Sequence, residues 1–206
     1  MTVFPEVRAS VDAALVGREA ASTRLADEAD TVARCCRDMA VRFHRGGKLI
    51  VFGNGGASAD ANHVAVEFVH PVIVGKPALP ALSLNNDVAT ITDVANGVGF
   101  SHVFAHQLRC LAEPADIALG VSPDGRCANV VEGLAAAAEM GLLTVALAGG
   151  DGGEMAAGAD VDHALVVDAT DPIVCKEVHV TTYHILWELV HVFLEQPGVL
   201  AREARA

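Results

Sequence analysis

The chain has no excess of basic residues. Its 206 residues include 14 lysines and arginines against 26 aspartates and glutamates, which gives a formal net charge of −12. Nucleic acids and anionic membrane surfaces attract proteins through basic patches, so we expect neither as a partner. The chain also has no uninterrupted apolar run long enough to span a membrane. Its first residues, MTVFPEVRAS, lack the basic and apolar regions of a signal peptide.

Signatures of paired cysteines are missing as well. The five cysteines are odd in number and none forms a CxxC spacing, which argues against a disulfide framework and against a zinc ribbon. We therefore expect reduced thiols and a cytoplasmic protein. The glycine run at residues 149–153 matches neither GxGxxG nor GxxxxGK followed by Ser or Thr, and we expect no nucleotide cofactor.

Apolar residues, in contrast, are abundant. They make up 52% of the sequence, whereas charged residues make up 19%. A chain of this length can bury a substantial core within one domain. The surplus of apolar side chains indicates that part of the surface is hidden between subunits.

The N-terminal part of the chain is predicted to be helical. Apolar residues recur at three- and four-residue spacing through residues 5–44, and Gly46 and Gly47 end the pattern. We therefore divide the chain into an N-terminal helical segment, residues 1–46, and an α/β domain, residues 47–200.

Five short apolar runs bounded by turn residues predict five strands, at residues 49–52, 79–84, 117–121, 142–147 and 164–167. Helical segments separate them, which favours a parallel sheet covered on both faces. Pro80 places the second strand near an edge or delays its start. Ligands of such sheets bind beyond the carboxyl ends of the strands, so the turns Gly53–Ser58 and Ser122–Cys127 are the expected walls of a site.

A long last helix follows the fifth strand. Asp171 can cap it, and Pro172 suits its first position. The helical pattern runs to about Glu195, and Pro197 and Gly198 are expected to close the helix.

The stretch Lys48–His70 combines a strand, a glycine turn and a helix. Gly55 and Gly56 can adopt positive φ angles and let the backbone approach a ligand closely. The helix after them would direct free N–H groups at an anion, with Ser58 or Asp60 as its cap.

One turn into this helix, His63 and Glu67 stand at positions i and i+4, so they share a face. Such a pair taken alone is an ordinary surface pair more often than a site. The preceding glycine turn, together with the resemblance described next, favours a functional pair. An imidazole and a carboxylate can divide between them the proton transfers of an enediol isomerisation.

Three segments of the chain are similar to one known family. They read GNGGASADANHVAVEF, LAGGDGGEMAAGADVDHALVV and KEVHVTTYHILWELVHVFLE, and they resemble the phosphoheptose isomerase branch of the SIS (sugar isomerase) domain family over nearly the whole chain. The resemblance implies a flavodoxin-like, doubly wound α/β fold with a five-stranded parallel sheet and two N-terminal helices. It also implies a homotetramer with active sites near subunit interfaces. The implied reaction converts sedoheptulose 7-phosphate to a heptose 7-phosphate through an enediolate.

The resemblance also implies roles for individual residues. Glu67 and His184 would be the acid/base pair. His63, Glu67 and His184 would bind one zinc ion per site, with a glutamine as the fourth ligand where this chain has Lys176. The residues expected to bind a phosphorylated sugar are Asn54, Gly55, Gly56, Ser58, Asn96, Ser122, Asp124, Arg126, Cys127 and Lys176.

The chain departs from the family pattern at Lys176 and in the loop Ser122–Cys127. A protonated Lys176 cannot be a metal ligand and would repel a cation, so it would pair with Glu67 or hold an anionic substrate, and zinc would keep three protein ligands and a water. Residues 122–127 read Ser-Pro-Asp-Gly-Arg-Cys where the family has a hydroxyl-rich phosphate loop. Asp124 places a negative charge where the phosphate would lie, and Arg126 or Lys176 would have to offset it.

Two other functions remain open. A related SIS branch binds the bacterial replication-initiator protein, and the segment ALSLNNDVATITDVAN resembles that branch, so a non-catalytic adaptor is one alternative. The presence of His184 argues against it, whereas the altered loop argues for it. A sensor that binds a phosphosugar without converting it is the other alternative.

Overall fold

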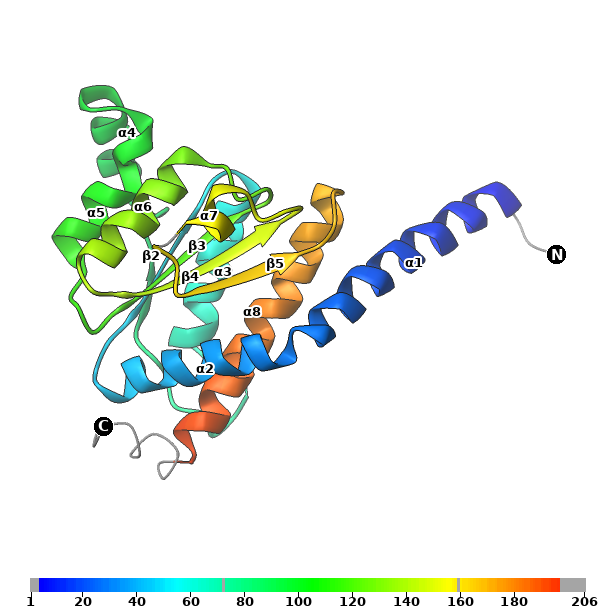
Figure 1. Cartoon of the computed structure of the whole chain (residues 1–206), viewed down its shortest axis with the longest axis horizontal. Coiled ribbons are helices and arrows are strands. Elements are labelled where there is room, and N and C mark those ends of the chain that lie inside the picture. The colour runs from blue at the N-terminus through cyan, green and yellow to red at the C-terminus, as the bar shows by residue number, and fades with distance from the viewer. Residues whose placement is uncertain (1–3, 72, 159, 197–206) are drawn as a thin grey trace.

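Strand β1 (Leu49–Gly53) is buried along its whole length and pairs with a neighbour on each side. The computed structural model describes residues 4–71, 73–158 and 160–196 (Figure 1). Within these ranges five parallel strands form one sheet in the order β2-β1-β3-β4-β5. The other strands are β2 (Ala81–Ser83), β3 (Ile117–Ser122), β4 (Leu143–Gly149) and β5 (His163–Val167). The predicted parallel sheet and the edge position of its second strand are therefore confirmed.

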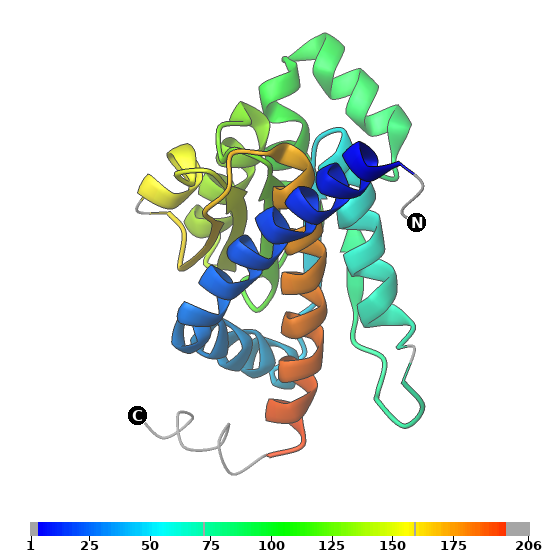
Figure 2. The same cartoon turned by 90° about the vertical axis from the view of Figure 1, so that its right-hand side faces the viewer.

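Helices cover both faces of the sheet (Figures 1 and 2). The first face is covered by α2 (Ala29–His44), α3 (Gly56–Val69) and α8 (Pro172–Leu194), and the second by α5 (Val103–Leu111) and α6 (Ala128–Glu139). The remaining helical segments are α1 (Pro5–Asp27), α4 (Val88–Gly97), α7 (Gly153–Ala157) and a 3-10 turn (Phe100–His102).

The side chains of β1 alternate between these two faces. Leu49 and Val51 belong to the core under α2, α3 and α8, whereas Ile50 and Phe52 belong to the core under α5 and α6. A strand that is buried on both faces has to be apolar throughout, because successive side chains point in opposite directions. This requirement is why the short apolar run predicted the strand.

The chain reverses its direction across the sheet between β1 and β3. From β1 it passes through α3 to the edge strand β2, and it then returns through α4 and α5 on the other face to β3. The carboxyl ends of β1 and β3 therefore meet at a topological switch point, where open α/β sheets bind ligands. The turns that follow these two strands, residues 54–55 and 123–127, lie within the predicted walls of the site, Gly53–Ser58 and Ser122–Cys127.

Helix α3 begins earlier than predicted. Gly55 is its N-cap, with a φ of 55°, and Gly56 is its first residue. The predicted capping by Ser58 or Asp60 is therefore wrong. The glycines allow the backbone to turn into the helix three residues sooner than a cap at Ser58 would, and the hydroxyl of Ser58 donates a hydrogen bond to the carbonyl oxygen of Gly55 at 2.7 Å.

Helix α8 begins as predicted. Pro172 is its first residue, and the side chain of Asp171 accepts a hydrogen bond from the amide of Ile173. Pro197 and Gly198, which we expected to close the helix, lie outside the described residues.

Helix α1 extends away from the sheet (Figure 1, blue). Four of its large apolar side chains are exposed, namely Val7, Val11, Leu15 and Val16. The predicted division into residues 1–46 and 47–200 stays a prediction, and residues 1–3 and 197–200 of it lie outside the described part of the chain.

His191 joins α8 to the segment that leads from α3 to β2. Its Nδ1 lies 2.8 Å from the carbonyl oxygen of Trp187, and its Nε2 lies 3.0 Å from that of Pro77. The imidazole is buried, and its centre lies 4.5 Å from that of the Trp187 ring system. One side chain therefore holds the last turns of α8 against the segment before β2.

All five cysteines are free thiols, and Cys35 and Cys36 are buried in the core. Burial raises the pKa of the Cys36 thiol to about 12. Among the helices of the described residues, none combines the length and the apolar character needed to cross a membrane.

Candidate active site

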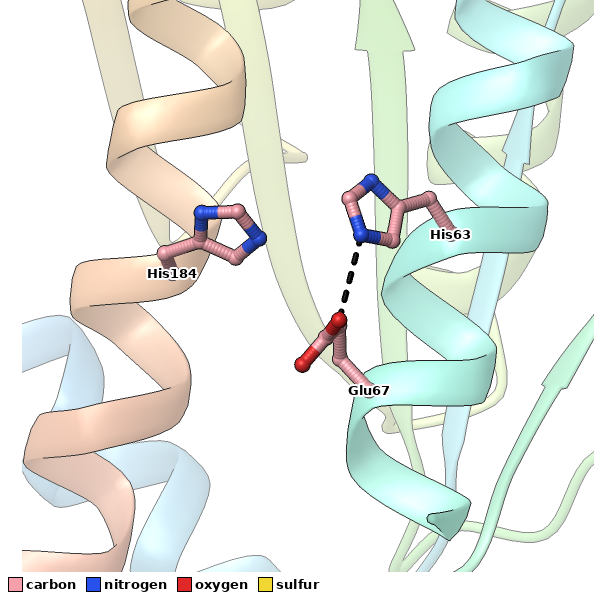
Figure 3. Close-up of side chains that lie close together, drawn as sticks. All are labelled: His63, Glu67 and His184. Atoms are coloured by element: carbon pink, nitrogen blue, oxygen red, sulfur yellow. Dashed lines mark hydrogen bonds and ion pairs between the residues drawn. The ribbon is translucent and has the colours of Figure 1, made fainter. Parts of the chain in front are cut away.

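Two helices bring three of the predicted site residues together. His63 and Glu67 of α3 point towards His184 of α8 (Figure 3). Nε2 of His63 lies 3.1 Å from Oε1 of Glu67, and the ring centres of His63 and His184 are 5.2 Å apart. One ligand atom from each residue lies within 4.8 Å of the other two. Among the described residues, no other group of histidine, cysteine and carboxylate side chains has this metal-binding spacing.

The packing of α3 sets the direction of its two site residues. Ala61, Val64 and Phe68 belong to the core against the sheet. His63 and Glu67 share a different face of the helix, which meets α8. The Glu67 side chain is 15% exposed and that of His63 is 41% exposed. The carboxylate is thus largely enclosed, while the imidazole beside it is open to solvent.

A residue that the sequence did not reveal contacts His63 from the other side. Oη of Tyr183 lies 2.7 Å from Nδ1 of His63. Tyr183 is buried, and this burial, together with the carboxylates of Asp60 and Glu67, raises the pKa of its hydroxyl. The hydroxyl therefore stays protonated near neutral pH, so it can either donate or accept a hydrogen bond. Its one signal in the sequence is its place directly before His184.

Lys176 forms an ion pair with Asp60. Its Nζ lies 2.6 Å from Oδ1 of Asp60 and 3.0 Å from the carbonyl oxygen of Gly56. Lys176 precedes His184 by two turns of α8, so it meets the first turns of α3, whereas Glu67 lies near the end of α3. The predicted alternative in which Lys176 pairs with Glu67 is therefore wrong. The ammonium instead places a positive charge beside the start of α3.

A cavity of about 470 Å³ lies between the first turns of α3 and α8. Three of the predicted substrate-binding residues line it, namely Asn54, Gly56 and Lys176. The other predicted residues, Gly55, Ser58, Asn96, Ser122, Asp124, Arg126 and Cys127, are not among its lining.

His179 also lines this cavity, one turn of α8 after Lys176. It is 2% exposed, and its Nε2 has no hydrogen-bond partner. Burial lowers the pKa of the imidazole, opposed by a hydrogen bond to the backbone of Ala148. The sequence does not indicate His179, because a single buried histidine on a helix carries no distinctive pattern.

The loop after β3 is held by its own hydrogen bonds. Ser122 donates from Oγ to Oδ1 of Asp124 at 3.1 Å and accepts from the amide of Gly125 at 3.1 Å. The same Oδ1 of Asp124 accepts from the amide of Arg126 at 3.0 Å. Arg126 was one of the two residues expected to offset the charge of Asp124. Its guanidinium instead lies 2.7 Å from the Asp151 carboxylate and lowers the pKa of that carboxyl group to about 2.

Asn54 and Asn129 exchange two hydrogen bonds. Nδ2 of Asn54 lies 2.6 Å from Oδ1 of Asn129, and Nδ2 of Asn129 lies 2.9 Å from Oδ1 of Asn54. This pair ties the turn after β1 to the first turn of α6 and so fixes the two walls of the crevice to each other. Asn96, in contrast, is exposed near the end of α4.

The donor set of the three-residue cluster suits a zinc ion. Two imidazole nitrogens and one carboxylate oxygen are ligands that zinc prefers, and three protein ligands with an open fourth position are typical of catalytic zinc. His63 would donate from its second nitrogen to Tyr183, as metal-bound histidines commonly do to an oxygen acceptor. His63, Glu67 and His184 therefore fit this metal, whereas the ammonium of Lys176 is paired with Asp60.

Comparison with known sequences gives relatives over most of the chain. The sequence model of the SIS domain family matches residues 17–149. A phosphoheptose isomerase of Solidesulfovibrio magneticus is 41% identical over 179 residues, which cover 85% of this chain and 86% of the relative. One of Nitratidesulfovibrio vulgaris is 42% identical over 167 residues, which cover 81% of this chain and 79% of the relative.

Solved structures agree with this assignment. A phosphoheptose isomerase from Neisseria gonorrhoeae superposes with a TM-score of 0.81 at 29% identity, covering 89% of this chain and 98% of that one. One from Francisella tularensis superposes with a TM-score of 0.83 at 28% identity, covering 92% of this chain and 98% of that one. The fold, the matched family model and these relatives together show that the chain belongs to the SIS domain family, in its phosphoheptose isomerase branch.

Proposed function

We propose that this chain is a sugar-phosphate isomerase that interconverts a ketose phosphate and an aldose phosphate, with sedoheptulose 7-phosphate as its substrate. The observation that carries this proposal is the convergence of Glu67 and His184, together with His63, from two helices. The relatives described above are named as isomerases, which does not favour the adaptor or the sensor.

The reaction needs a base at carbon and an acid at oxygen. Glu67 takes the proton from the carbon next to the carbonyl, and the C–H electron pair forms the double bond of the enediolate. His184 gives a proton to the carbonyl oxygen. The reverse transfers then act on the neighbouring carbon: Glu67 returns its proton to the former carbonyl carbon, and His184 takes one from the adjacent hydroxyl. The protein is left unchanged, and the carbonyl has moved by one carbon.

A zinc ion would be held by His63, Glu67 and His184, and when bound it would polarise the carbonyl of the sugar. The protein contributes the orientation of these three side chains. The Glu67 side chain is largely enclosed, which limits the contact of its carboxylate with water.

The phosphate of the sugar is proposed to bind at the start of α3. No side chain caps this helix, and the amides of Ala57 and Ser58 donate to the carbonyl oxygens of Asn54 and Gly55, so the positive end of the helix dipole is what favours an anion here. The ammonium of Lys176 lies 3.0 Å from the carbonyl oxygen of Gly56 in the same turn and adds a positive charge. The carboxylate of Asp124 accepts hydrogen bonds within its own loop, so the anion would lie nearer to Lys176 than to Asp124.

We further propose that the protein is a cytoplasmic homotetramer. Exposed apolar side chains along α1 support association, because a helix with such a face gains stability when a second subunit covers it. The number of subunits comes from the family resemblance, and light scattering of the purified protein would test it.

Product analysis tests the isomerase proposal. Purified protein is incubated with sedoheptulose 7-phosphate, and the appearance of a heptose 7-phosphate is followed by NMR. Glu67→Gln should lower kcat by a factor on the order of 10² to 10⁴, because the base at carbon is lost. Glu139→Gln, on the exposed end of α6, is the matched control and should leave kcat unchanged. A Glu67→Gln protein as active as the wild type, or a wild type that makes no product, would refute the proposal.

A further inference from the structure

Three side chains form a hydrogen-bonded row across α8 and α3. Oη of Tyr183 lies 2.7 Å from Nδ1 of His63, and Nε2 of His63 lies 3.1 Å from Oε1 of Glu67. Tyr183 is 1% exposed, so the surrounding core fixes the position of its ring. Both nitrogens of His63 are therefore engaged, one by a hydroxyl and one by a carboxylate.

The chemistry of the two partners fixes the direction of these hydrogen bonds. An ionised carboxylate only accepts, so Nε2 of His63 carries the hydrogen that it donates to Glu67. A neutral imidazole has a single N–H, which leaves a lone pair at Nδ1. The hydroxyl of Tyr183 then donates to Nδ1. In the absence of an ion, this arrangement gives both nitrogens of His63 a hydrogen-bond partner.

A cation bound at Nε2 requires the opposite tautomer of His63. The metal takes the lone pair of Nε2, so the hydrogen of a neutral ring has to be at Nδ1. Water, which reaches the 41% exposed side chain of His63, takes the proton from Nε2 and delivers one to Nδ1, so the net charge of the imidazole does not change. Tyr183 can follow this exchange, because a rotated hydroxyl accepts from Nδ1–H as well as it donated before.

We propose that Tyr183 is the positioning residue of His63, and that the reversal of its hydrogen bond lets Nε2 alternate between donating to Glu67 and binding a divalent cation. The inference rests on the proposed function, since it concerns the same cluster. Tyr183 is neither one of the proposed metal ligands nor part of the acid/base pair. Its proposed role depends on its hydroxyl oxygen alone.

The ring of Tyr183 makes the packing contacts, whereas its hydroxyl makes the hydrogen bond to His63, so the two contributions can be tested separately. Its ring meets the rings of His63 and His184 edge to face, with centres 5.3 and 5.0 Å apart. A phenylalanine would keep the ring and these contacts and would remove only the hydroxyl. The partner that loses its hydrogen bond is then Nδ1 of His63.

Calorimetric titration of metal-free protein with zinc tests the first part of this proposal. Tyr183→Phe should bind zinc 10- to 100-fold more weakly than the wild type, which is the usual effect of losing such a supporting hydrogen bond. Thr182→Val is the matched control: it removes a buried hydroxyl from the neighbouring residue, which bonds to the backbone of Val178, and it should bind zinc like the wild type. Equal affinities of Tyr183→Phe and the wild type would overturn the proposal.

NMR of the hydroxyl-bearing carbon of tyrosine tests the reversal itself. The chain contains a single tyrosine, so the labelled protein gives one signal. That signal should report a donating hydroxyl in metal-free protein and an accepting hydroxyl after zinc is added. A signal that zinc leaves unmoved, or a wild type that binds no zinc, overturns the inference. The product analysis above decides separately whether the protein is an isomerase.

Discussion

The ammonium of Lys176 lies 2.6 Å from a carboxylate oxygen of Asp60, and this ion pair connects the first turns of α8 and α3. The two partners differ in exposure: the Asp60 side chain is 8% exposed and that of Lys176 is 45% exposed. Loss of the ion pair would therefore destabilise the charged form of Asp60 more than that of Lys176, because water can solvate the exposed ammonium but not the enclosed carboxylate. The pair also lies at the cavity, so it combines a structural contact with a charge that a ligand can meet.

Lys176→Met should lower the free energy of unfolding by about 2 kcal/mol, because it leaves the buried carboxylate of Asp60 without its counter-charge. Urea denaturation measures this loss. The double variant Lys176→Met, Asp60→Asn should recover part of it. Arg109→Met, which breaks an exposed ion pair with Glu139, is the control and should change stability by less than about 1 kcal/mol. A loss no larger than that of the control would contradict the prediction.

Lys176→Gln should increase zinc affinity, and by more than Lys176→Met does. Both changes remove a positive charge, but the amide alone offers an oxygen, and the family resemblance implies a glutamine ligand at this position. Titration of the two metal-free variants separates the effect of charge from that of ligation. If neither variant binds zinc more tightly than the wild type, Lys176 does not influence the metal site.

Asn54 and Asn129 should be coupled in stability. Each single change to alanine leaves the other amide without two hydrogen bonds, so the two losses overlap. A double-mutant cycle measured by urea denaturation should give a coupling energy of about 1 kcal/mol. Strictly additive losses would show that the pair does not hold the walls of the crevice together.

His179 should make the protein less stable as the pH falls. Burial lowers the pKa of its imidazole, so the folded protein keeps it neutral in a range where the unfolded chain, with a pKa of about 6.5, binds a proton. The unfolded state then holds more protons, and the free energy of unfolding rises with pH and falls as the solution is acidified from pH 7 to pH 5.

Denaturation curves of the His179→Gln variant across this pH range check that sign. Its free energy of unfolding should depend less steeply on pH than that of the wild type. His70→Gln, which replaces an exposed histidine, should keep the wild-type slope. The same slope in all three proteins would mean that His179 does not control the response to acid.

The sequence predicted the parts of this structure that depend on local patterns. The apolar run at 49–52 predicted β1, and the i, i+4 spacing of His63 and Glu67 placed both on one face of α3. His184 joined them through the family resemblance, because no local pattern connects two helices that are distant in sequence.

The contacts that the sequence did not predict depend on how helices meet. Asp60 as the partner of Lys176, Tyr183 as the partner of His63, and Asn129 opposite Asn54 all require the relative positions of α3, α6 and α8. The cap of α3 was misplaced for a different reason. Serine is a common N-cap residue, which is why Ser58 was predicted to cap α3. The N-cap is instead Gly55, whose positive φ angle turns the chain into the helix without a side-chain cap.

The contact between Trp187 and His191 gives this protein a built-in optical probe. Trp187 is the single tryptophan of the chain, so its fluorescence arises from one place, the junction of α8 with the segment before β2. Indole emission responds to water and to proton-donating groups near the ring. Release of that segment from His191, or local opening of the end of α8, would therefore change the emission before the whole sheet unfolds. Motion at this junction can be timed on the unlabelled natural chain.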